Sequence, residues 1–152
     1  MADDPILRAL MAACPQARSA SSADAVAGGT PRYAASPATV AEASAVLRAA
    51  AEHDLAVVPR GSGSKLGWGA SPRRCDLVVD TLRLDRVLEH AAGDLVARVQ
   101  AGVSLDRLAE VLGGAGQELA LDPAPGRGCS RKTASTISPS VPNDPVNSLP
   151  RS

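Results

Sequence analysis

The chain is organised around Val57-Val58-Pro59-Arg60-Gly61-Ser62-Gly63-Ser64-Lys65-Leu66-Gly67-Trp68-Gly69, in which a short β-branched run leads into a glycine-rich loop. Glycines allow the backbone to adopt positive φ and to approach a ligand closely, so that successive N–H groups can converge on an anion. The hydroxyls of Ser62 and Ser64 are further donors. Arg60 and Lys65 add positive charge. The composition of this loop predicts a phosphate or pyrophosphate site.

The spacing of the loop excludes two common phosphate-binding motifs. A Walker A loop ends in Gly-Lys-Ser/Thr, whereas here Leu66 follows the lysine. The Gly-x-Gly-x-x-Gly fingerprint of dinucleotide-binding domains opens a helix. In this chain Gly63 and Gly67 are one residue too far apart, and Pro72 prevents a helix from following. The loop therefore belongs to another class.

The segments on both sides of the loop carry helix and strand signals. Thr39 and Glu42 form a capping-box pattern, which predicts a helix to about His53. Its expected apolar face is formed by Val40, Ala43, Val46, Leu47 and Ala50. We further expect strands at Ala56–Val58, Asp76–Asp80 and Leu95–Gln100, a helix from Ser104 to Gly113-Gly114, and a short apolar segment at Gln117–Leu121.

The order of these segments resembles the FAD-binding domain of the vanillyl-alcohol oxidase/p-cresol methylhydroxylase (PCMH-type) flavoprotein family. In that family a helix, a strand ending in Pro-Arg-Gly-x-Gly-x, further strands and a Gly-Val-Ser/Thr-Leu turn follow one another. This chain has the same order, with the turn at residues 102–105. Ser64-Lys65-Leu66 and Trp68-Gly69 are most similar to the glycolate oxidase-like members. The resemblance covers residues 36–125.

The resemblance implies a cofactor, a site and a substrate class. It implies that the loop holds the pyrophosphate of FAD, through Pro59, Arg60, Gly61, Ser62, Gly63, Ser64 and Lys65. Gly102 and the Asp122-Pro123 turn are further candidates for the neighbourhood of the cofactor. Ser64 stands where some members attach FAD covalently through a histidine, so non-covalent FAD is implied. The implied activity is oxidation of a small 2-hydroxy acid such as glycolate, with other subunits of a glycolate oxidase-like complex as partners.

The predicted fold is α+β: a small sheet with two flanking helices, equivalent to the first subdomain of a PCMH-type FAD-binding domain. Residues 1–35 are expected to be a partly flexible leader containing a short helix, and residues 36–125 the partial FAD domain. Residues 126–152 are rich in serine and proline and are expected to be disordered. The remainder of the family's FAD domain and its substrate domain do not follow, so we expect a truncated chain that is inactive alone, and we name no catalytic residue.

Composition limits the alternatives. Sixteen basic and sixteen acidic residues cancel, so no overall field favours nucleic acid. Three distant cysteines without a Cys/His cluster argue against a metal site or a disulfide framework, which favours a reducing, cytoplasmic location. The sequence contains no apolar stretch of transmembrane length.

Three hypotheses remain open at the level of the sequence. The chain is the cofactor-binding part of a flavin oxidoreductase, a nucleotide- or phosphate-binding module without chemistry, or an inert remnant that docks to a partner subunit. Bound flavin distinguishes the first hypothesis from the other two, and stabilisation by phosphate distinguishes the second from the third.

Overall fold

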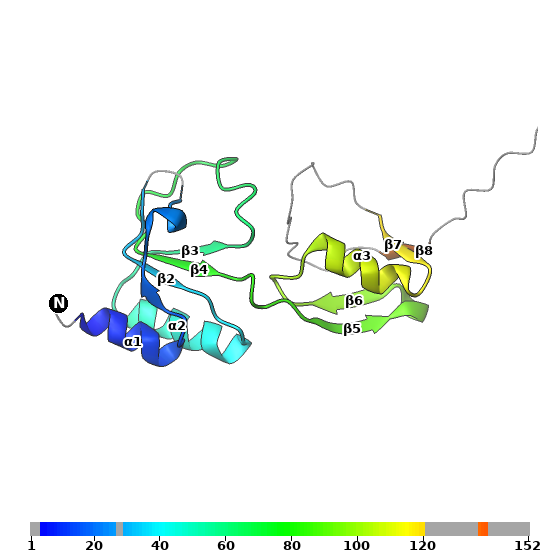
Figure 1. Cartoon of the computed structure of the whole chain (residues 1–152), viewed down its shortest axis with the longest axis horizontal. Coiled ribbons are helices and arrows are strands. Elements are labelled where there is room, and N and C mark those ends of the chain that lie inside the picture. Colours follow the sequence, from blue (N-terminus) through cyan, green and yellow to red (C-terminus); the bar gives the residue numbers. More distant parts are fainter. Residues whose placement is uncertain (1–3, 27–28, 121–136, 140–152) are drawn as a thin grey trace, which may run out of the picture.

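The computed structural model describes residues 4–26, 29–120 and 137–139, the last of these by their backbone only. Its elements form two groups joined by the segment that follows β4 (Figure 1). The first group contains α1 (Pro5–Ala13), β1 (Arg18–Ser19), the 3-10 turn η1 (Ser22–Asp24), β2 (Tyr33–Ala35), α2 (Val40–Glu52), β3 (Val57–Arg60) and β4 (Leu77–Asp80). The second contains β5 (Val87–Ala91), η2 (Ala92–Asp94), β6 (Val96–Val99), α3 (Leu105–Gly113), β7 (Gln117–Leu119) and β8 (Ile137–Pro139). The expected α+β class is confirmed.

The first group is built on a four-stranded sheet with the order β1-β2-β4-β3. β2, β4 and β3 run parallel, and β1 is antiparallel to β2. Because β3 is an edge strand, Pro59 fits into it without removing a donor that the sheet needs. The parallel register pairs Arg60 with Asp80, so both residues stand at the carboxyl ends of their strands.

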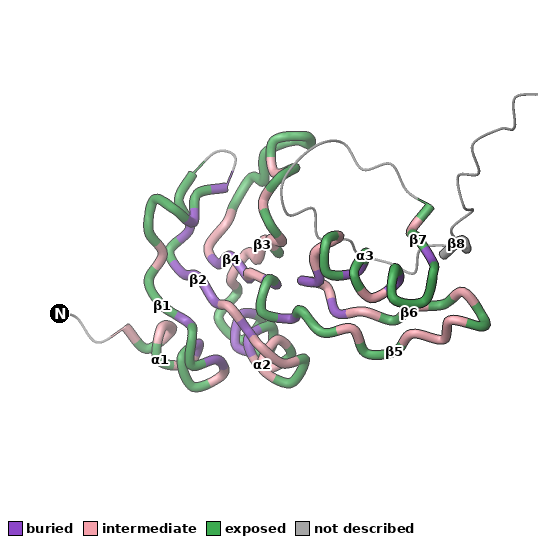
Figure 2. Tube along the Cα trace, turned by 45° about the vertical axis from the view of Figure 1, so that its right-hand side comes forward, coloured by how far each residue is buried: buried purple, intermediate pink, exposed green. Residues whose placement is uncertain are grey.

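One face of this sheet is covered by α1 and α2 (Figure 1). The core between these layers consists of small and aliphatic side chains around the single tyrosine; it contains Leu10, Cys14, Ala17, Tyr33, Ala35, Val46, Ala49, Ala50, Leu77 and Val79. In Figure 2 the buried segments gather where the sheet meets α2, whereas the connection between β3 and β4 is mostly exposed. The glycine-rich loop thus stands on a packed base.

The two capping residues predicted for α2 are present, but Glu42 accepts a hydrogen bond from a different residue than expected. Thr39 Oγ1 accepts from the N–H of Glu42 at 3.1 Å, as a capping box requires. The Glu42 carboxylate accepts from the N–H of Ala38, one residue before the expected donor. The buried face of the helix is Val46, Ala49 and Ala50, whereas Val40 and Leu47 of the expected face are exposed.

The expected leader takes part in the packed core. Asp4 caps α1, and Tyr33 Oη donates to the same carboxylate at 2.8 Å, which lowers the pKa of Asp4. Leu10 on α1 is fully buried and β2 lies between β1 and β4 in the sheet. The polar, alanine-rich composition of residues 1–35 concealed these contacts, because a few apolar residues suffice when a sheet is available for packing. The sheet is therefore flanked by α1 as well as α2, and the described chain contains three α-helices.

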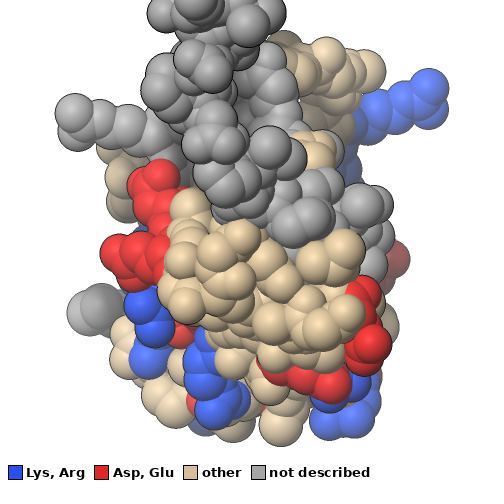
Figure 3. All heavy atoms as spheres, turned by 90° about the vertical axis from the view of Figure 1, so that its right-hand side faces the viewer, with Lys and Arg blue, Asp and Glu red and all other residues tan. Residues whose placement is uncertain are grey.

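The second group is an antiparallel hairpin, β5–β6, against which α3 packs. Ser104 Oγ accepts from the N–H of Arg107 and caps α3 as predicted, and the helix ends at Gly113. Its core is formed by Val103, Leu108 and Leu112, with Val87, Leu95, Ala97, Val99 and Leu119 against them. On the end of the molecule shown in Figure 3, positive and negative side chains alternate around an uncharged area.

β7 pairs antiparallel with β8, which places Leu119 opposite Ile137. Ile137–Pro139 thus form a strand inside the segment that was expected to be disordered. The rest of residues 126–152 lies outside the described residues, as does the Asp122-Pro123 turn.

Candidate functional site

The glycine-rich loop leaves the carboxyl end of β3 and returns to the amino end of β4. Ala56 and Asp76 lie at the opposite edge of the sheet, immediately before β3 and β4. The Asp76 carboxylate accepts there from the N–H of Ala56 at 2.8 Å. The loop therefore begins at the edge where the parallel strands end. Ligands of parallel α/β sheets bind outside the carboxyl ends of the strands, so the loop lies at the edge where a ligand is expected.

The first half of the loop has the conformation and the donors that an anion site needs. Gly63 has φ +78°, in the left-handed region that residues with a Cβ avoid. Within the described part of the chain, the backbone N–H groups of residues 61–65 donate to no protein acceptor. Ser62 Oγ lies 3.4 Å from Ser64 Oγ, so the two hydroxyls are neighbours. The loop keeps several donors available for a ligand.

These donors border an open pocket of about 340 Å³. Its lining combines the loop, the ends of β3 and β4, and the turn before β2; the residues are Ala23, Ala25, Arg60, Gly61, Ser62, Gly63, Leu66, Asp80 and Leu82. A pocket of this size has room for a diphosphate group. Of the predicted site residues, the structure brings Arg60 to Gly63 into this pocket.

The other predicted residues stand beside the pocket. Pro59 precedes it in β3, and Ser64 contacts Ser62. Lys65 Nζ lies 4.9 Å from the centre of the Trp68 ring, and this tryptophan is 72% exposed. The cation–π contact leaves Lys65 at the surface next to the loop.

The Arg60 guanidinium is committed to protein carboxylates. Its Nη2 lies 3.2 Å from Asp80 Oδ2 and 3.4 Å from Asp24 Oδ1, and its Nη1 donates to the Ala23 carbonyl at 3.3 Å. Because its charge is compensated there, Lys65 is the cation of the loop that is not paired with a carboxylate in the described structure.

Asp24 and Asp80 are components of the site that sequence reasoning missed. Asp24 is 1% exposed, and its hydrogen bonds from Arg18 hold the pKa of its carboxyl well below the ordinary range. The Ser21-x-x-Asp24 spacing could have indicated the role of Asp24, because this spacing is typical of a capping box and the structure shows one there. Asp80 gave a second signal as a charged residue ending a buried strand.

Gly102, one of the two further candidates for the neighbourhood of the cofactor, has a structural explanation. It packs against the backbone of Thr81 and Leu82, and its N–H donates to the Leu84 carbonyl at 2.7 Å. This close approach joins the two groups of elements and leaves no room for a Cβ. The glycine is therefore required by packing, without reference to a ligand.

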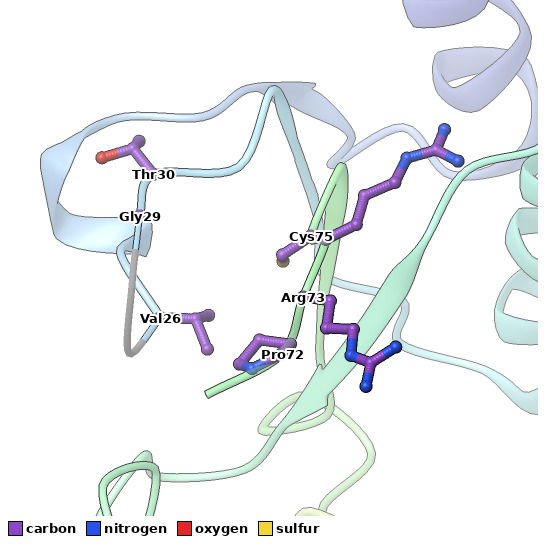
Figure 4. A pocket seen from close by; sticks show the side chains of 7 residues that line it. Val26, Gly29, Thr30, Pro72, Arg73 and Cys75 are labelled. Carbon is purple, nitrogen blue, oxygen red and sulfur yellow. The ribbon is translucent and has the colours of Figure 1, made fainter. Parts of the chain in front are cut away.

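A second pocket, of about 170 Å³, is a weaker candidate for a functional site (Figure 4). It is lined by Val26, Gly29, Thr30, Pro72, Arg73, Arg74 and Cys75. The Arg73 side chain extends away from Val26 and Thr30, and Arg74 pairs with Asp54 and Asp76. Burial and the charge of Asp76 raise the pKa of the Cys75 thiol, which disfavours the reactive thiolate. Among the described residues there is also no cluster of three or more metal-ligating side chains.

Sequence comparison assigns the chain to a family. A family model described as an FAD binding domain matches residues 31–130. The chain belongs to the FAD-binding domain family. An FAD-linked oxidoreductase of Mycobacterium tuberculosis, itself uncharacterised, is 42% identical over 78 residues, which are 51% of this chain and 17% of that protein. The glycolate oxidase subunit GlcD of Bacillus subtilis is 36% identical over 89 residues, which are 54% of this chain and 19% of that subunit. The chain thus matches less than one fifth of these relatives' length.

Solved structures show the same fold. The structure of p-cresol methylhydroxylase with bound substrate aligns with a TM-score of 0.66 and 16% identity, over 77% of this chain and 26% of that chain. Alkyldihydroxyacetonephosphate synthase aligns with a TM-score of 0.55 and 24% identity, over 62% of this chain and 19% of that chain. The predicted PCMH-type FAD-binding fold is thereby confirmed. No helix among the described residues is long and apolar enough to cross a membrane.

Proposed function

We propose that this chain supplies the pyrophosphate-binding loop of an FAD-dependent oxidoreductase, through the backbone of residues 60–65. One observation carries the proposal: a chain of the FAD-binding family presents unpaired N–H groups in a loop at the carboxyl ends of parallel strands. Such groups bind a diphosphate without needing a matching number of cations. Pro59 sets the entry of the chain into this loop.

The residues present fit the diphosphate of FAD. The donors are the N–H groups of residues 61–65, the hydroxyls of Ser62 and Ser64, and the Lys65 ammonium group. The carboxylate in the pocket lining, Asp80, is paired with Arg60, which reduces its repulsion of a phosphate. When bound, FAD supplies the redox chemistry. The chain binds and orients the cofactor.

The finer parts of the proposal concern attachment, substrate and partners. The loop offers hydroxyls rather than an imidazole or a thiol, so we propose that FAD is held non-covalently. Similarity to GlcD supports a small 2-hydroxy acid as the substrate class, with further subunits of a glycolate oxidase-like complex as partners. Cys14 and Cys75 are both unpaired, which supports a reducing, cytoplasmic location. Because the match covers a small part of the relatives, we expect cofactor binding without turnover from this chain alone.

Calorimetric titration with ADP and with FAD tests the loop. Alanine at Gly63 must adopt a positive φ, so Gly63→Ala should weaken binding of both ligands by about tenfold or more. Lys65→Ala removes one exposed charge and should weaken binding by about threefold at low salt, and less as salt screens the charge. Gly69→Ala is the matched control, since its φ is not positive and a Cβ there meets open space.

Unchanged FAD affinity in Gly63→Ala would show that the loop is only a turn. Flavin that stays with the acid-precipitated protein would refute non-covalent binding. If the protein binds ADP and FAD equally and gains no flavin absorbance during expression, the alternative of a nucleotide-binding module without redox chemistry is favoured. That alternative rests on the same loop, whose donors recognise a diphosphate and not a flavin ring.

A further inference from the structure

A chain of ion pairs beneath the loop ties it to a distant part of the sequence. Arg18 binds Asp24 through two hydrogen bonds, of 2.7 and 2.9 Å. Asp24 Oδ1 then contacts Arg60 Nη2, which is shared with Asp80. We call Asp24, Arg60 and Asp80 the carboxylate bridge. It connects Asp24 with Arg60, which is 36 positions later in the sequence and immediately precedes Gly61.

The carboxylate bridge also fixes the wall opposite the loop. Asp24 Oδ2 accepts from both the N–H and the hydroxyl of Ser21, which closes the η1 turn. Arg60 Nη1 binds the Ala23 carbonyl in that turn, and Ala23 and Ala25 line the pocket. On the other side, Asp80 Oδ1 accepts from the N–H of Leu82, another lining residue. One partly buried guanidinium therefore contacts both sides of the pocket.

The low exposure of these groups favours an arginine over a lysine at position 60. Asp24 is almost completely buried and the Arg60 side chain is 15% exposed. A planar guanidinium can serve two carboxylates and a carbonyl at once, whereas an ammonium group is a single point charge. Without Asp24, Arg60 keeps only Asp80 as a carboxylate partner among the described residues, and the link between the loop and the η1 turn through Asp24 is lost.

We propose that Asp24 is a positioning residue of the cofactor site: it holds the Arg60 guanidinium beneath the loop, so that the backbone of residues 61–65 and the η1 turn form a pocket of fixed shape for a diphosphate. Asp24 itself does not bind the ligand in this arrangement. The inference rests on the proposed binding of a diphosphate by the loop.

Substitution of Asp24 separates positioning from simple electrostatics, because the two predict opposite signs. Asp24→Asn keeps the size of the side chain and removes one negative charge beside an anion site. Electrostatic attraction alone then predicts tighter ADP binding. Positioning predicts weaker binding, by about tenfold, the effect of one lost charged hydrogen bond. Asp54→Asn is the charge-matched control: Asp54 precedes β3 and forms an exposed ion pair with Arg74, at the end of the β3–β4 connection that is distant in sequence from residues 61–65, and its loss should leave ADP affinity within about twofold.

A double-mutant cycle tests whether Asp24 acts through Arg60. ADP affinity is measured by calorimetry in the full chain, well below the melting temperature, for Asp24→Asn, Arg60→Lys and the combination. If Arg60 carries the effect, the two losses are not additive, and the double variant binds about as well as the weaker single variant. Additive losses would assign Asp24 a merely structural role and overturn the proposal. Arg60→Lys preserves net charge and should by itself weaken ADP binding by about fivefold; it decides the question if Asp24→Asn does not fold.

The outcomes distinguish this inference from the proposed function. If the unmodified chain binds neither ADP nor FAD, the proposed function fails. If it binds ADP, and Asp24→Asn or Arg60→Lys binds ADP as tightly or more tightly, only the positioning role is refuted.

Discussion

Gly102→Ala should destabilise the protein strongly although it adds a single methyl group. The new Cβ would overlap the Thr81 carbonyl oxygen and lie 2.9 Å from two backbone atoms of Leu82. An ordinary carbon–oxygen contact is about 3.3 Å, so one backbone segment must move by about 1 Å. Overpacking of this kind costs about 1–3 kcal/mol. The movement also endangers the 2.7 Å hydrogen bond from Gly102 to Leu84, which contributes about 1 kcal/mol.

The expected loss is therefore about 2–4 kcal/mol, or a melting temperature lower by about 10 °C. Thermal and urea denaturation followed by far-UV circular dichroism measure it. Gly93→Ala in the hairpin of the same group is the control, because a Cβ there meets nothing within 4 Å. If Gly102→Ala melts together with Gly93→Ala, the close approach of the two segments does not exist in solution and the explanation of this glycine is wrong.

Two further predictions concern the segment before the family match. Leu10→Ala removes a fully buried side chain and should lower the free energy of unfolding by about 2–4 kcal/mol in urea denaturation, whereas Met11→Ala, at a position that is 49% exposed, should change it by less than about 0.5 kcal/mol. Equal small effects would mean that α1 does not dock on the sheet. Because the folded-state pKa of Asp24 is lowered, its contribution to stability is complete above the ordinary carboxyl pKa near 4 and is lost as the pH falls further. Between about pH 5 and pH 3, Asp24→Asn should therefore lose less stability than the unmodified chain, and identical pH dependence of the two would contradict the depressed pKa.

Local chemistry was enough to predict most of the elements and the position of the glycine-rich loop. Thr39 and Ser104 predicted where their helices begin, because a cap depends only on residues within one turn. The loop was recognisable because glycines allow backbone conformations that other residues avoid, and the positive φ of Gly63 agrees with that interpretation. The order of these local signals also identified the FAD-binding family.

Only the tertiary structure decided which residues meet across the chain. α2 is rich in alanine, so its apolar periodicity did not select Val46, Ala49 and Ala50 over Val40 and Leu47 as the buried face. The buried face of α2 is selected by its contact with the sheet, which is assembled from strands distant in sequence. For the same reason the sequence could present Arg60 as a phosphate-binding cation, whereas folding pairs it with Asp24 and Asp80. A side chain's charge is a local property, but whether that charge is available to a ligand depends on what the fold places beside it.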